Sequence, residues 1–235
     1  MKVHFLLFAG VTQLDLTGPY EVLARAPGFE IELVAKTAHP VRSDRGLMLV
    51  PSTTIALAEA CDLLVVPGGP GTDDAILDAE WVEFTRRQAA TARYVFGICT
   101  GSLLLGAAGL LEGRRSSCHW QAREFLPYFG AITSEDRMCV DGNLYTSGGV
   151  TSGIDMALKV VAILCGPAVA QEIQLQIEYD PEPPFPGGTP RTSEAHIVQK
   201  CLAATQARRT LREAAVRKAA AALPAQPPRR ALCSE

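Results

Sequence analysis

The segment Tyr94-Val95-Phe96-Gly97-Ile98-Cys99-Thr100-Gly101 joins an apolar strand to a helical pattern at residues 102–108. A Gly-x-Cys-x-Gly pattern between a strand and a helix is that of a nucleophile elbow, with a thiol where many hydrolases carry a hydroxyl. The turn would present the Cys99 sulfur above the sheet, and the N-terminus of the following helix would favour the thiolate. The sequence therefore predicts Cys99 as a catalytic centre. The other six cysteines are interpreted as small buried hydrophobes.

The composition is that of a globular protein with a substantial core. Of the 235 residues, 48% are hydrophobic and 20% are charged, which suits one large domain or two small ones. The net charge of −3 gives no signal for nucleic acid or an anionic membrane, and seven scattered cysteines do not suggest a disulfide framework. The apolar run at residues 3–8 is too short for a signal peptide, and no segment is long enough to span a membrane. We expect a cytoplasmic protein with reduced thiols.

Strand and helix patterns alternate along the chain. Apolar runs predict strands at residues 3–8, 30–36, 62–66 and 93–98, shorter strands at 115–118, 137–140 and 144–146, and a hairpin at 41–51. Helical patterns cover residues 16–25, 81–91, 102–108, 151–164 and 168–179. This alternation predicts an α/β fold in which helices sandwich a mostly parallel, flavodoxin-like sheet.

The last part of the chain differs in kind. Residues 180–188 are rich in proline and glycine and predict an extended surface loop. Residues 189–223 are expected to supply a C-terminal helix that packs on the same domain as residues 1–188, and residues 224–235 a flexible tail. The basic residues of this helix are interpreted as a solvated face rather than a nucleic-acid site: Arg208, Arg209, Arg212, Arg217 and Lys218.

Three loops follow predicted strands at the carboxyl edge of the sheet, where open α/β sheets place their sites. Residues 13–19 carry Asp15, residues 67–71 read Pro-Gly-Gly-Pro-Gly, and the third loop is the elbow at Cys99. Asp15 either caps the adjacent helix or exchanges protons with a substrate. The glycine turn either ends its strand or directs backbone N–H groups, such as that of Gly69, at developing negative charge. Both pairs of interpretations stay open at this point.

These residues resemble the ThiJ/PfpI branch of the class I glutamine amidotransferase-like superfamily over residues 1–188. The resemblance rests on the Asp15 loop, Val66-Pro67-Gly68-Gly69, the elbow at residues 97–102, Cys118-His119-Trp120 and the Gly-Gly-Val-Thr-Ser-Gly-Ile-Asp run at 148–155. Within the family, the chain is most similar to members that hydrate isocyanides. That finer likeness rests on residues 13–19, the Cys99-Thr100 pair and Gln176-Ile177-Glu178-Tyr179.

The resemblance implies a homodimer that acts on a small isocyanide without a cofactor. The four histidines are dispersed without a paired spacing for a metal, and neither nucleic acid nor a membrane is expected as a partner. Cys99 would be the nucleophile, Asp15 its acid–base partner and Thr100 a neighbouring hydrogen-bonding residue. Residues expected to bind the oxyanion or the substrate are Gly68, Gly69, His119 and Tyr179, with a structural role beside Trp120 as the alternative for His119. The implied reaction forms a thioimidate on Cys99, which water converts to an N-substituted formamide, in a pocket with apolar walls.

Two departures separate the chain from other relatives. Peptidase-like members carry a histidine directly after the nucleophile, where this chain has Thr100. Transcription-factor members continue into a helix-turn-helix region, for which one long C-terminal helix is too little. Two alternatives stay open. One is another cysteine-dependent hydrolase or a glyoxal-type detoxification enzyme on the same Cys99–Asp15 site, and the other is a module that senses a ligand or oxidation through a reactive thiol.

Overall fold

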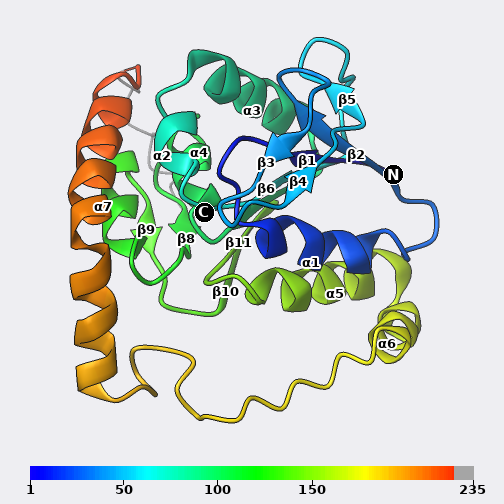
Figure 1. Cartoon of the computed structure of the whole chain (residues 1–235). Helices are drawn as coiled ribbons and strands as arrows, with labels where there is room; N and C mark the ends of the chain where they lie inside the picture. The colour runs from blue at the N-terminus through cyan, green and yellow to red at the C-terminus, as the bar shows by residue number, and fades with distance from the viewer. Residues whose placement is uncertain (225–235) are drawn as a thin grey trace, which may run out of the picture.

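A seven-stranded sheet forms the centre of the structure, a computed structural model in which residues 1–224 are described (Figure 1). The strands lie in the order β10 (Met138–Asp141), β11 (Leu144–Ser147), β7 (Tyr94–Ile98), β6 (Leu63–Val66), β1 (Lys2–Leu6), β2 (Glu30–Ala35) and β5 (Thr53–Thr54). Every neighbouring pair is parallel except β10 with β11. Across the sheet, β2, β1, β6, β7 and β11 follow one another in the flavodoxin-like order. The predicted mostly parallel α/β fold is therefore confirmed.

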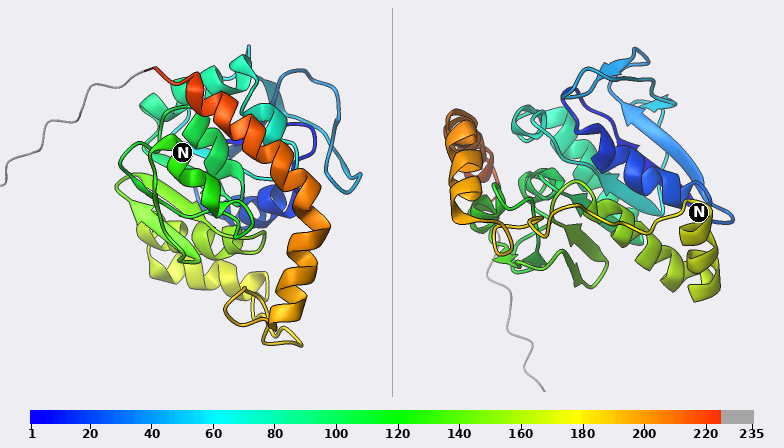
Figure 2. Two further views of the ribbon diagram at one scale, coloured as in Figure 1. Left: turned by 90° about the vertical axis from the view of Figure 1, so that its left-hand side faces the viewer. Right: turned by 60° about the horizontal axis from the view of Figure 1, so that its bottom comes forward.

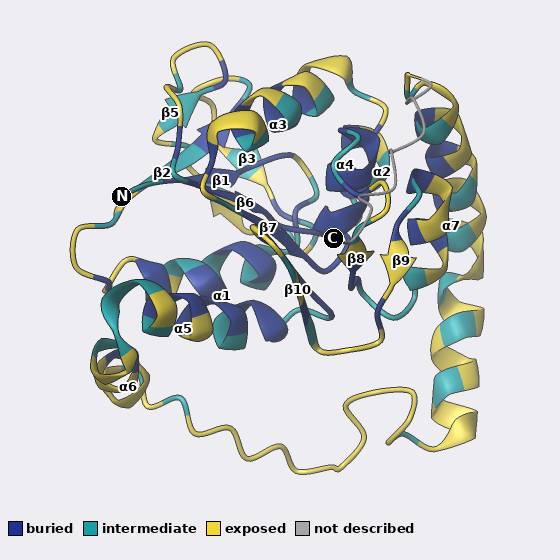
Figure 3. Cartoon of the chain, turned by 180° about the vertical axis from the view of Figure 1, so that it is seen from behind, coloured by how far each residue is buried: buried dark blue, intermediate teal, exposed yellow. Residues whose placement is uncertain are grey.

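Helices cover both faces of this sheet (Figure 1). On one face α1 (Gln13–Leu23) packs against α5 (Ser152–Cys165), and α6 (Pro167–Gln176) packs against α5. The opposite face carries α3 (Ala79–Thr91) and α4 (Gly101–Ala107), with the short α2 (Thr72–Ala75) beside α4. Seen from behind, the buried residues of α1 and α4 lie toward the sheet and exposed residues gather on the outside of α3 and α6 (Figure 3). The sheet is thus shielded from solvent on both sides.

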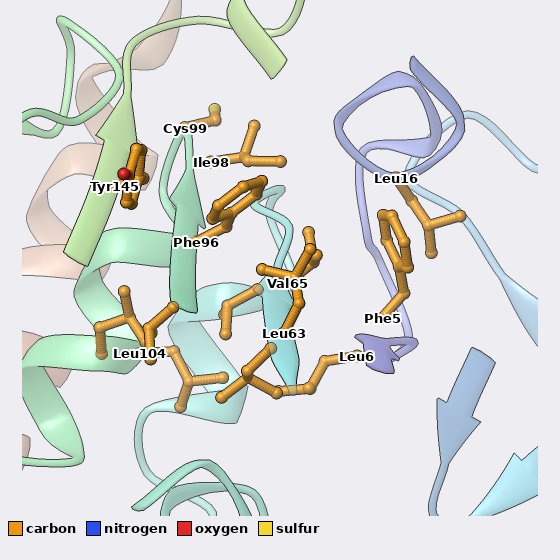
Figure 4. Close-up of a cluster of buried hydrophobic side chains, with 14 of the residues drawn as sticks. Phe5, Leu6, Leu16, Leu63, Val65, Phe96, Ile98, Cys99, Leu104 and Tyr145 are labelled. Carbon is orange, nitrogen blue, oxygen red and sulfur yellow. The ribbon is translucent and has the colours of Figure 1, made fainter. Parts of the chain in front are cut away.

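The strands at the centre of the sheet are apolar along their whole length, because helices cover both of their faces. All four residues of β6 are fully buried, as are Phe5 of β1 and Phe96 of β7. Figure 4 shows these side chains gathered across β1, β6 and β7, with Cys99 beyond the end of β7. Burial of one such side chain contributes roughly 1.5–3 kcal/mol. This core fixes the strand ends and so the positions of the loops that leave them.

Two helices begin two or three residues earlier than the sequence predicts. α3 begins at Ala79 rather than residue 81, because Asp78 Oδ1 accepts hydrogen bonds from the N–H groups of Glu80 and Trp81 at 3.0 and 3.4 Å. α1 begins at Gln13 rather than residue 16, and Thr12 occupies its N-cap position. Asp15 therefore lies inside the first turn of α1. The interpretation of Asp15 as a helix cap is wrong.

The smaller strands agree with the sequence in part. The predicted hairpin at residues 41–51 is present as β3 (Val41–Arg42) and β4 (Met48–Leu49). The strand predicted at 115–118 is shorter, since β8 (Arg115–Ser116) pairs only with β9 (Ile132–Thr133), apart from the main sheet. Side chains bind the backbone of the next residue, Ser117. Its N–H donates to Thr146 Oγ1 and its carbonyl accepts from Ser102 Oγ, both at 2.8 Å. The 3₁₀ helix η1 (Arg123–Phe129) follows and was not predicted.

The C-terminal helix α7 (Ala195–Ala221) lies along one edge of the molecule, and an extended, exposed segment at residues 180–194 leads to it (Figure 2). The second half of α7 packs against η1, α2 and α4, whereas its first half projects beyond the domain (Figure 2). Both the extended loop and the single long helix were predicted. The tail expected at residues 224–235 lies, apart from Pro224, outside the described residues.

Several arginines of α7 pair with carboxylates of the same chain. These pairs are Arg212 with Asp73, Arg209 with Glu124, and Arg217 with Glu213. Arg212 is itself buried, so the interpretation of these side chains as one solvated face is wrong at that position. Along residues 1–224, no helix combines the length and the apolar character that crossing a membrane requires.

Candidate active site

Three loops meet at the carboxyl edge of the sheet next to β1 and β6, where the chain order of the strands reverses and open α/β sheets bind their ligands. The loop after β1 brings Asp15, β6 leads into Gly68, and β7 leads into Cys99. The Gly68 N–H donates to Asp15 Oδ2 at 3.1 Å. A Cβ atom on Gly68 would lie 2.5 Å from Thr100 N and 2.9 Å from Asp15 Oδ2. Only glycine lets the three loops approach this closely.

Cys99 occupies the strained turn of a nucleophile elbow. Its φ is 56°, in the left-handed region that residues other than glycine rarely adopt. Its N–H donates to the Ser147 carbonyl at the end of β11, at 3.1 Å. A Cβ atom on Gly101 would lie 2.0 Å from the Val66 carbonyl oxygen, so α4 can approach β6 only with glycine there. Strain of this kind is typical of positions where a fold holds a reactive side chain.

The Asp15 carboxyl group is completely buried beside this cysteine. Burial raises the pKa of Asp15 to about 7, and the charge of Asp44 acts in the same direction. Hydrogen bonding with the Cys99 thiol and with the Gly68 N–H opposes that rise in pKa. Within residues 1–224, Oδ1 of Asp15 has no nitrogen or oxygen donor. A carboxyl group with this pKa can both accept and return a proton near neutral pH.

The Cys99 thiol is protonated in the resting site. Burial raises its pKa well above the ordinary value, and the neighbouring Asp15 and Cys118 raise it further. The Thr100 N–H lowers the pKa of Cys99, but this effect is smaller than that of burial. The N-terminus of the following helix was expected to favour the thiolate, and the Thr100 N–H acts in that direction, but burial of Cys99, which is 5% exposed, has the larger effect. Above pH 7 the Asp15–Cys99 pair holds one proton, on sulfur.

Thr100 ties the glycine turn to the elbow. Its Oγ1 accepts a hydrogen bond from the Gly69 N–H at 2.8 Å and donates to the Gly69 carbonyl at 3.1 Å. Thr72 Oγ1 lies 3.0 Å from the same hydroxyl. The N–H groups of Gly68 and Gly69 thus both have partners in this structure, and they hold the loops together.

Sequence reasoning missed two residues of this site. Thr72 is fully buried and completes the Thr100 hydrogen bonds, yet in the sequence it only follows a glycine-rich turn. Ser147 binds the Cys99 backbone through its carbonyl, and within the described residues its buried hydroxyl has no partner. Its one sequence signal is its place at the end of a predicted strand.

His119 lies on the neighbouring wall and is not bonded to Asp15 or Cys99 in the described part of the chain. Its Nδ1 accepts a hydrogen bond from the Gln121 N–H at 3.3 Å, and its Cδ2 would lie 3.3 Å from a Cβ atom on Gly149. Burial and then the charges of Arg212 and Arg123 lower the pKa of His119 to about 4. The imidazole is therefore neutral at physiological pH.

Tyr179 is anchored away from Asp15 and Cys99. Its hydroxyl donates to Asp155 Oδ1 at 2.5 Å, in the first turn of α5. Asp155 also pairs with Arg137. No hydrogen bond joins Tyr179 to Cys99 or Asp15 among residues 1–224. The structure brings Asp15, Gly68, Gly69, Cys99 and Thr100 together and leaves His119 and Tyr179 outside that group.

A cavity of about 750 Å³ opens beside His119. Its walls come from the segment that carries His119 and Arg123, from residues 148–151 after β11, and from residues 188–191 of the extended segment. Gly148 directly follows Ser147, the residue that binds the Cys99 backbone. The lining of this cavity includes Arg123, Arg137 and Arg191, and the expectation of apolar walls around the reacting atoms stays a prediction.

Known proteins share this architecture. A model of the DJ-1/PfpI family matches residues 1–163. The chain is 47% identical over 223 residues to an isonitrile hydratase of Pseudomonas putida, which covers 95% of this chain and 98% of that protein. A crystal structure of a ThiJ/PfpI family protein from Pseudomonas syringae matches with a TM-score of 0.89 and 39% identity, over 92% of this chain and 90% of that one.

A relative with a further domain is more distant. The HTH-type transcriptional regulator CdhR of Pseudomonas aeruginosa is 30% identical over 181 residues, but the match covers only 53% of its length. The family model, by contrast, covers most of this chain, and the isonitrile hydratase match extends over nearly all of both proteins. The chain belongs to the DJ-1/PfpI family and is a homologue of isonitrile hydratase.

Proposed function

We propose that this protein adds water to the terminal carbon of an isocyanide, R–NC, and releases the N-substituted formamide R–NH–CHO. The observation that carries this proposal is the buried Asp15 carboxyl group against the Cys99 thiol, a proton acceptor beside a soft nucleophile. The near full-length similarity to an isonitrile hydratase supports the same reaction. Asp15, Cys99 and Thr100 are our assignment of the catalytic residues.

In the first step the S–H bond of Cys99 adds across the isocyanide carbon. The Asp15 carboxylate accepts the thiol proton, and the sulfur electron pair forms the C–S bond. The lone pair on the isocyanide carbon then takes that proton from Asp15, which forms the C–H bond. The product is a thioimidate, R–N=CH–S–Cys99, and Asp15 is a carboxylate again. The Asp15 pKa near 7 suits both halves of this transfer.

In the second step water adds to the same carbon. Asp15 takes a proton from water while the oxygen forms its bond to carbon, and the C=N electron pair moves to nitrogen, which receives that proton. Collapse of the adduct breaks the C–S bond, the hydroxyl proton passes through Asp15 to sulfur, and the formamide leaves. The Thr100 N–H already lowers the pKa of Cys99. We assign it as the backbone donor that stabilises the negative charge that develops beside the Cys99 sulfur. Gly68 and Gly69 serve by holding the loops.

Loss of the isocyanide infrared band in the presence of the protein tests this function. We expect the band of a simple alkyl isocyanide to disappear with wild-type protein, while the matching formamide forms in equal amount. The control is protein whose Cys99 has been alkylated beforehand. If no isocyanide is consumed but dicarbonyls are, the protein is instead a detoxification enzyme on the same Cys99–Asp15 site.

We further propose that the protein is a homodimer, and that residues 1–223 form one folding unit. The exposed segment at residues 180–194, with Phe185 77% exposed, and the projecting half of α7 offer surface that a second copy would cover. Packing of the other half of α7 on η1, α2 and α4 supports the single unit. Six unpaired cysteines in the described residues support a cytoplasmic location. Light scattering that gives the mass of one chain at micromolar concentration would contradict the dimer.

A further inference from the structure

The cavity beside His119 is built from four segments that are separate in the sequence, and three of them contribute an arginine. Arg123 belongs to η1, Arg137 precedes β10, and Arg191 comes from the extended segment before α7. Two carboxylates, Glu124 and Glu135, also line the cavity. The balance of these charges depends on which of them are already paired.

Most of the charged groups in the cavity have partners. Arg137 pairs with Asp155 and donates to Thr151 Oγ1 at 3.2 Å. Arg191 Nη1 lies 3.4 Å from Glu135 Oε2, and both side chains are 67% exposed. The second carboxylate, Glu124, forms a two-bond pair with Arg209, at 2.6 and 2.8 Å. Neither carboxylate of the cavity is therefore free to neutralise Arg123.

Arg123 is the exception among these arginines. In the part of the chain that the structure describes, no carboxylate lies within ion-pair distance of it, and its Nε atom is buried without an acceptor. A buried guanidinium N–H without a partner is costly, and the group that best satisfies it is a planar anion that accepts two hydrogen bonds. The cavity is thus lined by one arginine without a carboxylate partner, and the Nε–H of this arginine has no acceptor among the described residues.

His119 adds a second donor beside this arginine. Because its Nδ1 accepts the Gln121 N–H, the proton of the neutral ring is on Nε2. This side of the ring faces Gly149, whose Cβ position lies 3.8 Å from Nε2. The charges of Arg212 and then Arg123 disfavour the protonated imidazole of His119 and oppose the rise in the pKa of Cys118 that burial causes.

Two residues that line the cavity, His119 and Gly148, directly follow residues that lie near Cys99. Cys118, which precedes His119, acts on the pKa of Cys99 and so lies close to it. Gly148, on the opposite wall, follows the serine that binds the Cys99 backbone. A substituent that extends from Cys99 past Gly148 and His119 would reach Arg123.

We propose that this cavity binds an anionic group, in particular a carboxylate, on the substituent of the substrate, with Arg123 as its main partner and His119 Nε2–H as a second donor. The proposal rests on the isocyanide-hydrating function and gives it a substrate class, the isocyano carboxylates. Arg123 and His119 are specificity-determining residues in this scheme. Asp15 and Cys99 carry out the chemistry on any isocyanide.

A matched pair of substrates tests the proposal. For a series of isocyanoalkanoates of increasing chain length and their methyl esters, kcat/KM would be measured with wild type, Arg123→Gln and Arg25→Gln. Arg25 pairs with Glu21 near the C-terminal end of α1, away from the cavity, and serves as the control. We expect wild type to prefer the acid over the ester at the best chain length by about tenfold to a hundredfold, the usual worth of a charge-assisted hydrogen bond.

Arg123→Gln is expected to remove this preference, and Arg123→Lys to restore part of it, while Arg25→Gln keeps the wild-type ratio. Equal kcat/KM values for acid and ester in wild type, or an unchanged ratio in Arg123→Gln, would overturn the proposal and leave the hydratase function standing. Binding of the N-formyl amino carboxylate product, measured by calorimetry against its methyl ester, is a second readout that needs no turnover. If no isocyanide reacts, the hydratase function fails. The binding difference between wild type and Arg123→Gln then decides the anion site alone.

Discussion

Two buried cysteines, Cys99 and Cys118, lie next to each other at the carboxyl edge of the sheet, and their surroundings differ. Burial raises the pKa of both thiols, that of Cys118 to about 12. The nearby charges of Arg212 and Arg123 favour the Cys118 thiolate, whereas Asp15 disfavours the Cys99 thiolate. From nearby charge alone, Cys118 would be the better nucleophile.

The presence of a proton acceptor favours Cys99 over Cys118 as the nucleophile. Asp15 faces the Cys99 thiol and has a pKa near 7, so it can take the proton at the moment of attack. No side chain is found hydrogen-bonded to Cys118 in the described residues. Cys99 also occupies a strained turn with φ of 56°, while Cys118 follows an ordinary short strand. We therefore predict that a partner able to accept the proton, rather than a lowered resting pKa, makes Cys99 the reactive thiol of the two.

The largest expected effect is that of Cys99→Ala. We expect no measurable turnover of any isocyanide, since the variant has no atom that can form the thioimidate. The fold should be kept, because a buried thiol packs as a small hydrophobe and its replacement by a methyl group loses little contact. Infrared turnover assays and thermal unfolding check the two parts. Near wild-type activity would move the nucleophile to Cys118 and end the comparison.

The second largest effect on the rate is expected for Asp15→Asn. Asparagine keeps the shape and can still accept the Gly68 N–H, but it cannot exchange a proton with sulfur or water. Because positioned proton transfer contributes about a hundred- to ten-thousand-fold in rate, we expect a loss of kcat/KM in that range. Mass spectrometry after mixing with substrate separates the steps. A thioimidate that accumulates on Cys99 assigns Asp15 to the attack of water, and unmodified protein assigns it to the first attack. Rates near those of wild type would remove the acid–base role.

The same variant has a distinct effect on stability. The folded-state pKa of Asp15, about 7, lies above its ordinary value of 3.8. The contribution of this group to stability is therefore complete below about pH 4 and is lost as the pH rises through about 7. Asp15→Asn should be more stable than wild type above that window, by on the order of 2–4 kcal/mol, and equal to it in acid. Urea unfolding at the two ends of the window measures this difference.

The pH dependence of the wild-type enzyme is the next expected effect. The reactive state of the pair has one proton, on sulfur, with Asp15 ionised. Below about pH 7 Asp15 takes a second proton, so kcat/KM should fall about tenfold for each further pH unit. Above it the rate should be constant, because the Cys99 pKa is far higher. A rate that instead declines as the pH rises through 7 would mean that Asp15 must start as the acid.

Thr100→Val should have a smaller effect. It removes the hydroxyl that joins both backbone groups of Gly69 to the elbow, and it leaves the Gly69 N–H and the Thr72 hydroxyl without that partner. Buried groups left unpaired cost about 1–3 kcal/mol of folding free energy, and we expect about a tenfold loss of rate as the glycine turn shifts. Thr100→Ser, which keeps the hydroxyl, is the control. Equal stability of the two variants would contradict the role assigned to Thr100.

How far the sequence predicted this site depends on the kind of physics involved. The elbow, the central strands and the three loops at one sheet edge follow from local patterns and the chirality of parallel strands, and all were predicted. The protonated state of the Cys99 thiol was not predicted. The effect of burial on its pKa outweighs that of the seven-residue helix α4, and burial is a tertiary property. The start of α1, and with it the place of Asp15, was missed by three residues.

Contacts between distant segments could not be predicted from the sequence either, because they too depend on the tertiary structure. Thr72 and Thr100 meet only because α2 packs beside α4. The arginines of the cavity come from positions 123, 137 and 191, and no spacing in the sequence relates them. The arginines of this cavity therefore needed the structure, whereas the proposed nucleophile, Cys99, was predicted from the sequence.

The smallest effect is expected for Cys118→Ala, and it is the sharpest test of the comparison. Cys118 is fully buried, so the loss of its sulfur should cost about 1 kcal/mol of stability, the usual size for one core substitution. The rate should stay within about twofold of wild type, since Cys118 neither bonds to substrate nor exchanges protons in the scheme above.

Cys61→Ala is a matched control, because Cys61 is also buried with a pKa raised to about 12, but lies beside β6 at the other end of the sheet. If both variants behave alike, proximity to Cys99 gives Cys118 no part in catalysis. If Cys118→Ala alone loses rate on the scale expected for Asp15→Asn, a proton acceptor is not what separates the two cysteines, and the thiol beside Arg123 takes part in the reaction.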